Sequence, residues 1–179
     1  MSLDTLNGKI FENLTRRQLF SQVLEGFQDL IGKIPLKINC VPLRGVNDEE
    51  ILKIAALAKN NSISVRFIEL MPIGCDFESG LSGIPTAEIF STLEKNFGGQ
   101  IGFIDALEHK FCANCNRIRL TAEGFIKTCL SFDAGLDIKN LLRSDDKNLE
   151  EKIREAIYFK PKEHFFKDTT KFQMYQVGG

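Results

Sequence analysis

Residues 36–70 read LKINCVPLRGVNDEEILKIAALAKNNSISVRFIEL, and this stretch decides the fold class. Its two ends, 36–43 and 63–70, have the apolar character and length of strands. Between them, apolar residues recur at spacings of three and four over 51–58, and 47–50 places an asparagine three residues before a glutamate. This pattern predicts a helix opened by a capping box. A strand, a helix and a second strand in this order predict a parallel βαβ unit.

Both predicted strands carry polar residues on one face. Side chains alternate between the faces of a strand, so Lys37 shares a face with Asn39, and Ser64 shares one with Arg66. A strand buried between two helical layers is almost uniformly apolar. Two interpretations are therefore open: these faces line the polar, cationic lumen of a barrel, or they lie at a solvent-facing edge. An active site at the carboxyl ends of barrel strands would favour the lumen.

For the rest of the chain, the spacing of apolar residues predicts helices and strands, and glycine and proline residues mark where they end. We expect these elements in chain order: a helix at 16–31, a loop at 74–85, a helix at 86–97 capped by Thr86, a strand at 101–104, a hairpin of 117–121 with 125–128, helices at 136–143 and 149–159, and an extended segment at 172–179.

Composition excludes several classes of protein. The 179 residues are 43% hydrophobic and 26% charged with a net charge of -1, which is typical of a globular chain. This charge argues against nucleic acid or an anionic membrane as a partner. No apolar run approaches the roughly 20 residues that span a bilayer. Without a basic and apolar leader, we expect a cytoplasmic protein.

The cysteines indicate a metal site. Five cysteines without a leader fit a disulfide framework poorly, and three of them form the pattern Cys112-x2-Cys115-x13-Cys129. Three thiolates suit zinc with a fourth ligand or an iron–sulfur cluster. His109 stands three residues before Cys112 and could complete a Cys3His zinc site. Spacing alone favours a structural zinc.

Two arginines follow the cysteine pair. Arg117 and Arg119 alternate with apolar residues, so both lie on one face of the predicted strand. Guanidinium groups hold phosphate or carboxylate in a bidentate manner, although a solvated face paired with acidic neighbours is the ordinary alternative. Together with Lys37 and Arg66 they would make a pocket of four cations, the size that a triphosphate needs.

The cysteine segment also carries a family resemblance. Residues 111–130 read FCANCNRIRLTAEGFIKTCL and closely resemble the C-terminal cluster motif of the molybdenum cofactor biosynthesis A proteins, the GTP 3′,8-cyclases among the radical S-adenosylmethionine enzymes. Further matches lie at 2–4, 37–39, 43–48, 66–72, 101–104 and 178–179.

This resemblance implies a fold and a division of the chain. The family is similar to other radical S-adenosylmethionine enzymes in having an incomplete parallel (βα)6 barrel, followed by an α+β region with a second 4Fe–4S cluster. The chain would then be an α/β protein in which 1–73 is the C-terminal half of the barrel. Residues 74–179 would form the cluster- and substrate-binding region.

The resemblance also implies a site. Cys112, Cys115 and Cys129 would ligate the second 4Fe–4S cluster, leaving one iron open for the guanine base of GTP, so His109 is not needed and the preference for zinc is reversed. The other implied site residues are Arg117 and Arg119 at the substrate, Lys37 and Arg66 around the triphosphate, Ser2 near S-adenosylmethionine, and Gly178 and Gly179 in a tail that reaches the active site.

The chain departs from the family in two respects. It lacks the CxxxCxxC motif that binds the first 4Fe–4S cluster, and it is shorter than the family around 97–101. We expect a C-terminal part that needs the missing N-terminal half of the barrel and is inactive alone. The open edge of a half-barrel predicts a homo-oligomer. Two alternatives stay open: a non-catalytic zinc-stabilised binding module, and a different radical enzyme with an auxiliary cluster.

Overall fold

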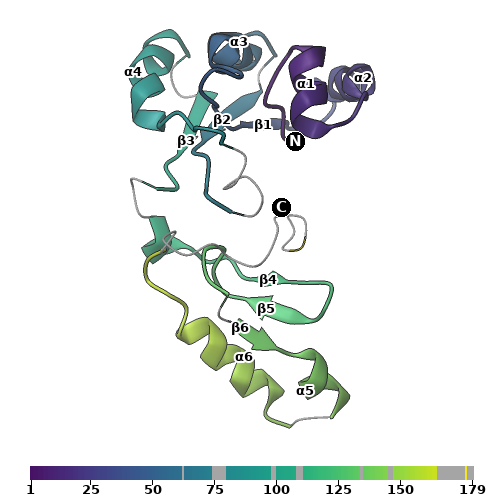
Figure 1. Cartoon of the computed structure of the whole chain (residues 1–179), viewed down its shortest axis with the longest axis vertical. Coiled ribbons are helices and arrows are strands. Elements are labelled where there is room, and N and C mark those ends of the chain that lie inside the picture. Colours follow the sequence, from purple (N-terminus) through teal and green to yellow (C-terminus); the bar gives the residue numbers. More distant parts are fainter. Residues whose placement is uncertain are drawn as a thin grey trace. The chain divides into compact units, whose positions relative to one another are not determined.

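The computed structural model describes residues 1–61, 63–73, 80–97, 100–107, 111–133, 135–144, 147–164 and 176. Contacts divide the chain into two compact units, one formed by 1–70 with 81–108 and the other by 71–80 with 109–179. Figure 1 labels the elements of both units. In the described residues, no helix is long and apolar enough to cross a membrane.

The first unit is built on a parallel sheet of three strands. They are β1 (Lys37–Cys40), β2 (Ser64–Ile68) and β3 (Ile101–Ile104), in the order β1-β2-β3. The 3-10 turn η1 (Asp48–Glu50) and helix α3 (Ile51–Asn61) join β1 to β2. The predicted βαβ unit is therefore confirmed.

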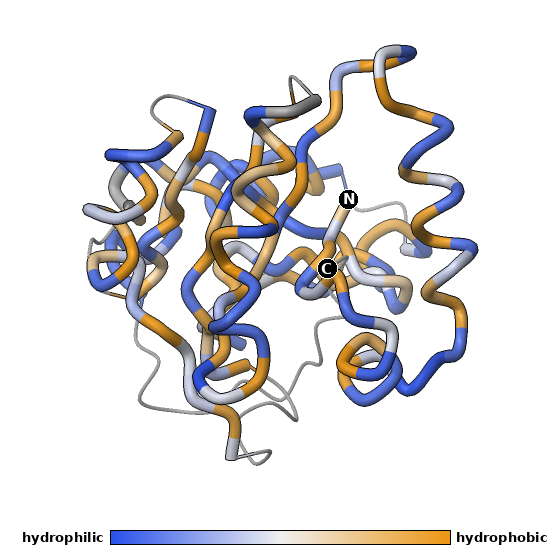
Figure 2. Tube along the Cα trace, turned by 90° about the horizontal axis from the view of Figure 1, so that it is seen from above, coloured by the Kyte–Doolittle hydropathy of each residue, from blue (hydrophilic) through white to orange (hydrophobic). Residues whose placement is uncertain are grey.

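Helices lie along one side of this sheet (Figure 1). Helix α4 (Thr86–Phe97) precedes β3, as the sequence predicts, while α1 (Gly8–Thr15) and α2 (Phe20–Leu30) precede β1. The helices carry hydrophilic and hydrophobic residues in alternation, as Figure 2 shows, so that one helix face can pack while the other meets water. Their apolar faces and the sheet enclose one core: Leu3, Phe27, Ile38, Cys40, Ile51, Ile54, Ala55, Ala58, Ile63, Val65, Phe67, Ile84, Leu93 and Ile101.

The predicted helix at 16–31 is wrong in its start. Helix α1 ends at Thr15, its C-cap Arg16 has a left-handed φ of 56°, and α2 begins only at Phe20. A left-handed residue cannot continue a right-handed helix, so the chain breaks here. The α1 helix itself was signalled by Asn7, whose side-chain oxygen caps Lys9 N at 2.9 Å.

The predicted capping box at 47–50 is also wrong. The Asn47 side chain turns back into the core, where its oxygen accepts from Leu43 N at 2.7 Å and its amide donates to the carbonyls of Asp4 and Val41. Glu50 accepts from the Thr5 hydroxyl and from Leu6 N instead of capping the helix. Both side chains therefore bind the N-terminal segment to the loop after β1.

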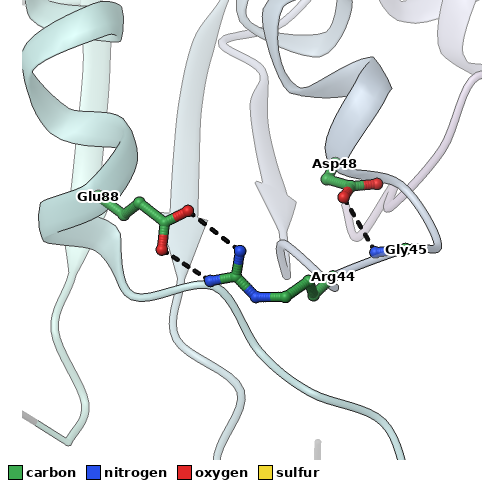
Figure 3. A network of polar contacts seen from close by, with 4 residues as sticks. All are labelled: Arg44, Gly45, Asp48 and Glu88. Carbon is green, nitrogen blue, oxygen red and sulfur yellow. Dashed lines mark hydrogen bonds and ion pairs between the residues drawn. The ribbon is translucent and has the colours of Figure 1, made fainter.

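Further polar contacts hold the loop that follows β1, as Figure 3 shows. The Arg44 guanidinium forms a bidentate pair with Glu88 of α4, at 3.2 and 2.7 Å. Gly45 has a φ of 69° and its N–H donates to Asp48. The positive φ favours glycine at this turn. Because the ion pair is exposed, it adds little to stability.

The second unit contains an antiparallel sheet. Its strands are β4 (Arg119–Leu120), β5 (Phe125–Lys127) and β6 (Gly135–Asp137), in that order. The hairpin predicted between 117–121 and 125–128 is confirmed with shorter strands, and it turns at Gly124, whose φ is 83°. The 3-10 turn η4 (Phe111–Asn114) precedes it, and α5 (Lys139–Arg143) and α6 (Leu149–Tyr158) follow.

The predicted helix at 136–143 is wrong in its first half. Residues 135–137 pair with the free edge of β5, with Phe125 opposite Asp137, and only α5 is helical. Hydrogen bonds to the open strand edge outweigh the helical pattern there. The predicted helix at 149–159 corresponds to α6.

The two sheets establish the mixed α/β class. The two compact units are defined by contacts between residues, and α4 and β3 belong to the unit with the parallel sheet. The reason is that β3 pairs with β2 along its length. A division at residue 73 into functional regions stays a prediction.

Candidate metal and anion site

The parallel sheet presents a polar row on one face. Asn39 lies opposite Arg66, and Arg66 lies opposite Gly102 of β3. In β1 and β2 the alternate positions are buried, which leaves Lys37 exposed and Arg66 half-buried. The predicted sharing of faces within each strand holds, and the parallel register puts both polar sets on one side of the sheet.

Ser2 extends this row at the outer edge. It forms a parallel bridge with Asn39, supported by the bonds Leu3 N to Asn39 O and Asn39 N to Met1 O, both 2.9 Å. The N-terminal ammonium donates to Lys37 O at 2.8 Å. Ser2 is exposed, and the first three residues partly cover the edge of β1 that would otherwise be open.

The cysteine segment folds into a single tight turn. Cys115 N donates to Cys112 O at 3.0 Å across η4, which brings the two residues together. Cys129 follows β5, and its sulfur lies 3.2 Å from the Ser131 hydroxyl. Cys112, Cys115 and Cys129 are free thiols and half-buried. The turn and the hairpin therefore place all three near one another.

The thiols act on one another electrostatically. Burial raises the pKa of Cys112, and the nearby Cys129 and Cys115 raise it further, although a backbone bond from His164 acts in the opposite direction. Their mutual effect shows proximity. In the described part of the chain, no three His, Cys, Asp or Glu side chains yet meet in metal-binding geometry.

The surroundings of Cys115 stabilise its thiolate relative to that of an ordinary cysteine. Burial raises the pKa of this thiol, but a backbone bond from Arg117, a hydrogen bond from Lys160 and the charge of Arg119 together lower it below its ordinary value. A lowered thiol pKa increases the fraction of thiolate, which is the form that binds metals. By donor type alone, three free thiols with nearby cations suit an iron–sulfur cluster held by three cysteines.

The segment after α6 packs against this turn. The Lys160 ammonium donates to Cys115 O, Cys115 Sγ and Arg117 O, while the His164 backbone contacts Cys112. Sequence reasoning missed both residues, because 45 positions separate Lys160 from Cys115. A lysine after a helix end carries no local signal of such a contact.

A buried lysine supports the third cysteine. Lys127, two residues before Cys129, has a fully buried side chain that donates to Phe132 O and pairs with Asp133 at 3.0 Å. These bonds join β5 to the loop before β6. Sequence reasoning missed this residue too, because a buried lysine and a solvated one look the same in sequence.

The two arginines of the motif differ in setting. Arg119 is half-buried in β4, and in the antiparallel ladder it lies opposite Lys127 of β5. Arg117 is exposed and precedes the strand, so strand alternation does not fix its side relative to Arg119. Their shared face stays a prediction.

The four cations that the sequence analysis predicts at the substrate have no carboxylate partner in the described part of the chain. Within the described residues, none of the four forms an ion pair: Lys37, Arg66, Arg117 and Arg119. Lys37 and Arg66 belong to the first unit and the two arginines to the second, so the convergence of all four stays a prediction. His109, Gly178 and Gly179 lie outside the described residues.

Comparison with known proteins identifies the family. Residues 85–166 match the family model described as Molybdenum Cofactor Synthesis C. The chain is 36% identical over 209 residues to a GTP 3′,8-cyclase of Clostridium perfringens (strain SM101 / Type A). It is 35% identical over 207 residues to that of Moorella thermoacetica, and 38% over 204 residues to that of Clostridium botulinum (strain Langeland).

Each of these alignments covers 100% of this chain and 64% of the relative, so the chain spans less than two thirds of the length of these relatives. The aligned lengths exceed the 179 residues of this chain, so the relatives carry internal residues that it lacks. The match to the family model defines a molybdenum cofactor synthesis region. Over its whole length the chain is similar to GTP 3′,8-cyclases, and residues 85–166 carry the match to the Molybdenum Cofactor Synthesis C family.

Proposed function

We propose that this chain forms the substrate-binding part of a GTP 3′,8-cyclase and acts in molybdenum cofactor synthesis. The family match and relatives named for this activity support the proposal. The single observation that carries it is the group of three free thiols flanked by cations. Such a site can hold a cluster beside a nucleotide.

Cys112, Cys115 and Cys129 would hold a 4Fe–4S cluster. Three protein ligands leave one iron of such a cluster open, and that iron can bind a nitrogen or oxygen atom of a substrate. The thiols are half-buried and unpaired by disulfides, and the cations near Cys115 compensate thiolate charge. The donor set therefore suits the cluster without a histidine.

The four cations would hold the triphosphate of GTP. Arg117 and Lys37 are exposed, while Arg119 and Arg66 are half-buried, so each can be reached by a ligand. A guanidinium group meets phosphate with two parallel N–H donors, and lysine adds a point charge. Freedom from ion pairs within the described residues supports this role.

The first unit would belong to the incomplete radical S-adenosylmethionine barrel. Its parallel sheet has helices on one side and a polar row on the other, which suits a wall whose polar face meets the ligand. In this proposal Ser2 lies near S-adenosylmethionine, and Gly178 and Gly179 form the tail. A first cluster, S-adenosylmethionine and an N-terminal half of the barrel complete the enzyme.

Anaerobic reconstitution with iron and sulfide tests the cluster. We expect about four irons per chain and a broad charge-transfer absorbance, with a spectral change on adding GTP. Cys129→Ser should lose most of the iron, because one of three ligands is replaced. Cys40→Ala is the matched control, since Cys40 is buried in the core of the other unit.

A colourless chain with one tightly bound zinc and no response to GTP would contradict this function. That result would favour the zinc-stabilised binding module.

A further inference from the structure

The residue that follows helix α6 has an unusual environment. Lys160 lies just beyond the helix end, and its backbone N–H donates to Ile157 O at 3.2 Å. Its side chain is half-buried and points to the cysteine turn. The helix end thus fixes the base of this side chain.

The ammonium of Lys160 has a full set of acceptors. It donates to Cys115 O at 2.7 Å, to Arg117 O at 2.7 Å and to Cys115 Sγ at 3.2 Å. An ammonium has three N–H donors, and three acceptors are present. Such saturation distinguishes Lys160 from a solvated surface lysine.

Two of these hydrogen bonds hold the backbone of the cysteine turn, and the third brings the positive charge of Lys160 to the Cys115 sulfur. The carbonyl bonds hold the backbone from Cys115 to Arg117, which joins the second thiol of the motif to its first arginine. The bond to Sγ puts a positive charge against the sulfur itself. Hydrogen bonds to ligating sulfurs and nearby charge are known determinants of metal retention and of cluster reduction potential.

We infer that Lys160 is a positioning residue for the metal centre, which orients the Cys115 turn and raises the reduction potential of a cluster bound there. The inference rests on the proposed function only in taking Cys115 as a ligand. A cluster gains one negative charge when it accepts one electron, and a cation 3.2 Å from a ligand sulfur stabilises that reduced form.

The test compares Lys160→Met with Lys160→Arg in the full chain, each reconstituted anaerobically. Methionine keeps much of the side-chain volume and removes the charge and donors, whereas arginine keeps both. Lys162→Met is the matched control, because Lys162 is exposed and two residues away. The readouts are the midpoint potential in a dithionite titration and the rate of iron release to a chelator.

Lys160→Met should shift the potential to more negative values and release iron about tenfold faster. Lys160→Arg should restore most of the potential, and Lys162→Met should match the unmodified chain. A potential in Lys160→Met equal to that of the unmodified chain would overturn the inference. If the unmodified chain took up no iron, the proposed function would fail instead, so the two failures are distinguishable.

Discussion

Arg66 of β2 lies in register with Gly102 of β3, and a Cβ atom at Gly102 would stand 3.4 Å from Arg66 Cγ. The missing side chain at this position leaves room for the arginine on the polar face of the sheet. A Cβ at this distance would just touch Arg66, so a side chain larger than that of alanine at position 102 would crowd the arginine.

Gly102→Val should therefore weaken GTP binding. Valine adds three carbon atoms, and its two methyl groups would crowd Arg66 and displace the guanidinium, so we expect about tenfold lower affinity, or about 1.4 kcal/mol. Isothermal titration with GTP measures this change. Gly26→Ala is the control, because a Cβ there meets nothing within 4 Å. Unchanged affinity in Gly102→Val would show that Arg66 does not bind the nucleotide.

Arg119→Ala should lower GTP affinity more than Arg117→Ala. Arg119 is half-buried and its charge acts on Cys115, whereas Arg117 is exposed and better screened by water. We expect losses of about 2 and about 1 kcal/mol respectively. Equilibrium binding at two salt concentrations measures both.

The exposed Arg143 of α5 provides the control for this pair, and Arg143→Ala should bind GTP normally. Equal effects of all three substitutions would indicate a general loss of positive charge instead of a specific site.

Ile54→Ala should destabilise the first unit by about 3 kcal/mol. Ile54 is fully buried in the core between α3 and the sheet, and truncation leaves a cavity. Leu52→Ala on the same helix is the matched control, because Leu52 is 49% exposed. Urea unfolding measures both free energies, and similar values would argue against the assigned helix face.

Asp4 should make the chain less stable as pH rises. Burial raises the pKa of its carboxyl, and the bond from Val41 N only partly offsets this effect. The folded state then binds the proton more tightly than the unfolded state. Stability from this group is present below the unfolded pKa and is lost as pH rises through the folded pKa.

Asp4→Asn removes this titration and keeps an oxygen that can accept from Val41 N. The variant should be more stable than the unmodified chain at about pH 7, with the difference shrinking at about pH 3, below the ordinary pKa of aspartate. Urea unfolding at both pH values decides this. A larger advantage at the lower pH would contradict the direction of the shift.

Local pattern predicts local structure well in this chain. The βαβ unit, α4, β3 and α6 were predictable, because their periodicity agrees with their final packing. One failure is local, the left-handed Arg16 that separates α1 from α2, and the other two are long-range. The side chains of Asn47 and Glu50 form hydrogen bonds with the N-terminal segment instead of capping their helix. Residues 135–137 form a strand that pairs with β5 instead of a helix. Tertiary hydrogen bonds decide such cases, and sequence spacing does not show them.

The candidate site likewise has a part that local sequence predicts and a part that depends on long-range contacts. Cysteine spacing predicts three thiols as metal ligands, and the local turn and hairpin bring them near enough to influence one another, while their role as ligands stays a prediction. Lys160 and the His164 backbone approach from a distant helix end, and Lys127 is buried by a loop that follows it. Their roles depend on packing and cannot be read from spacing.

The order of the strands also matters while the chain is being made. β2 is the middle strand, with β1 synthesised before it and β3 only after α4. On the ribosome, one edge of β2 must wait unpaired until residues 101–104 leave the exit tunnel. Unpaired edges of growing chains are sites of misassembly. The speed of translation through 71–100 therefore bears on the yield of correctly folded protein.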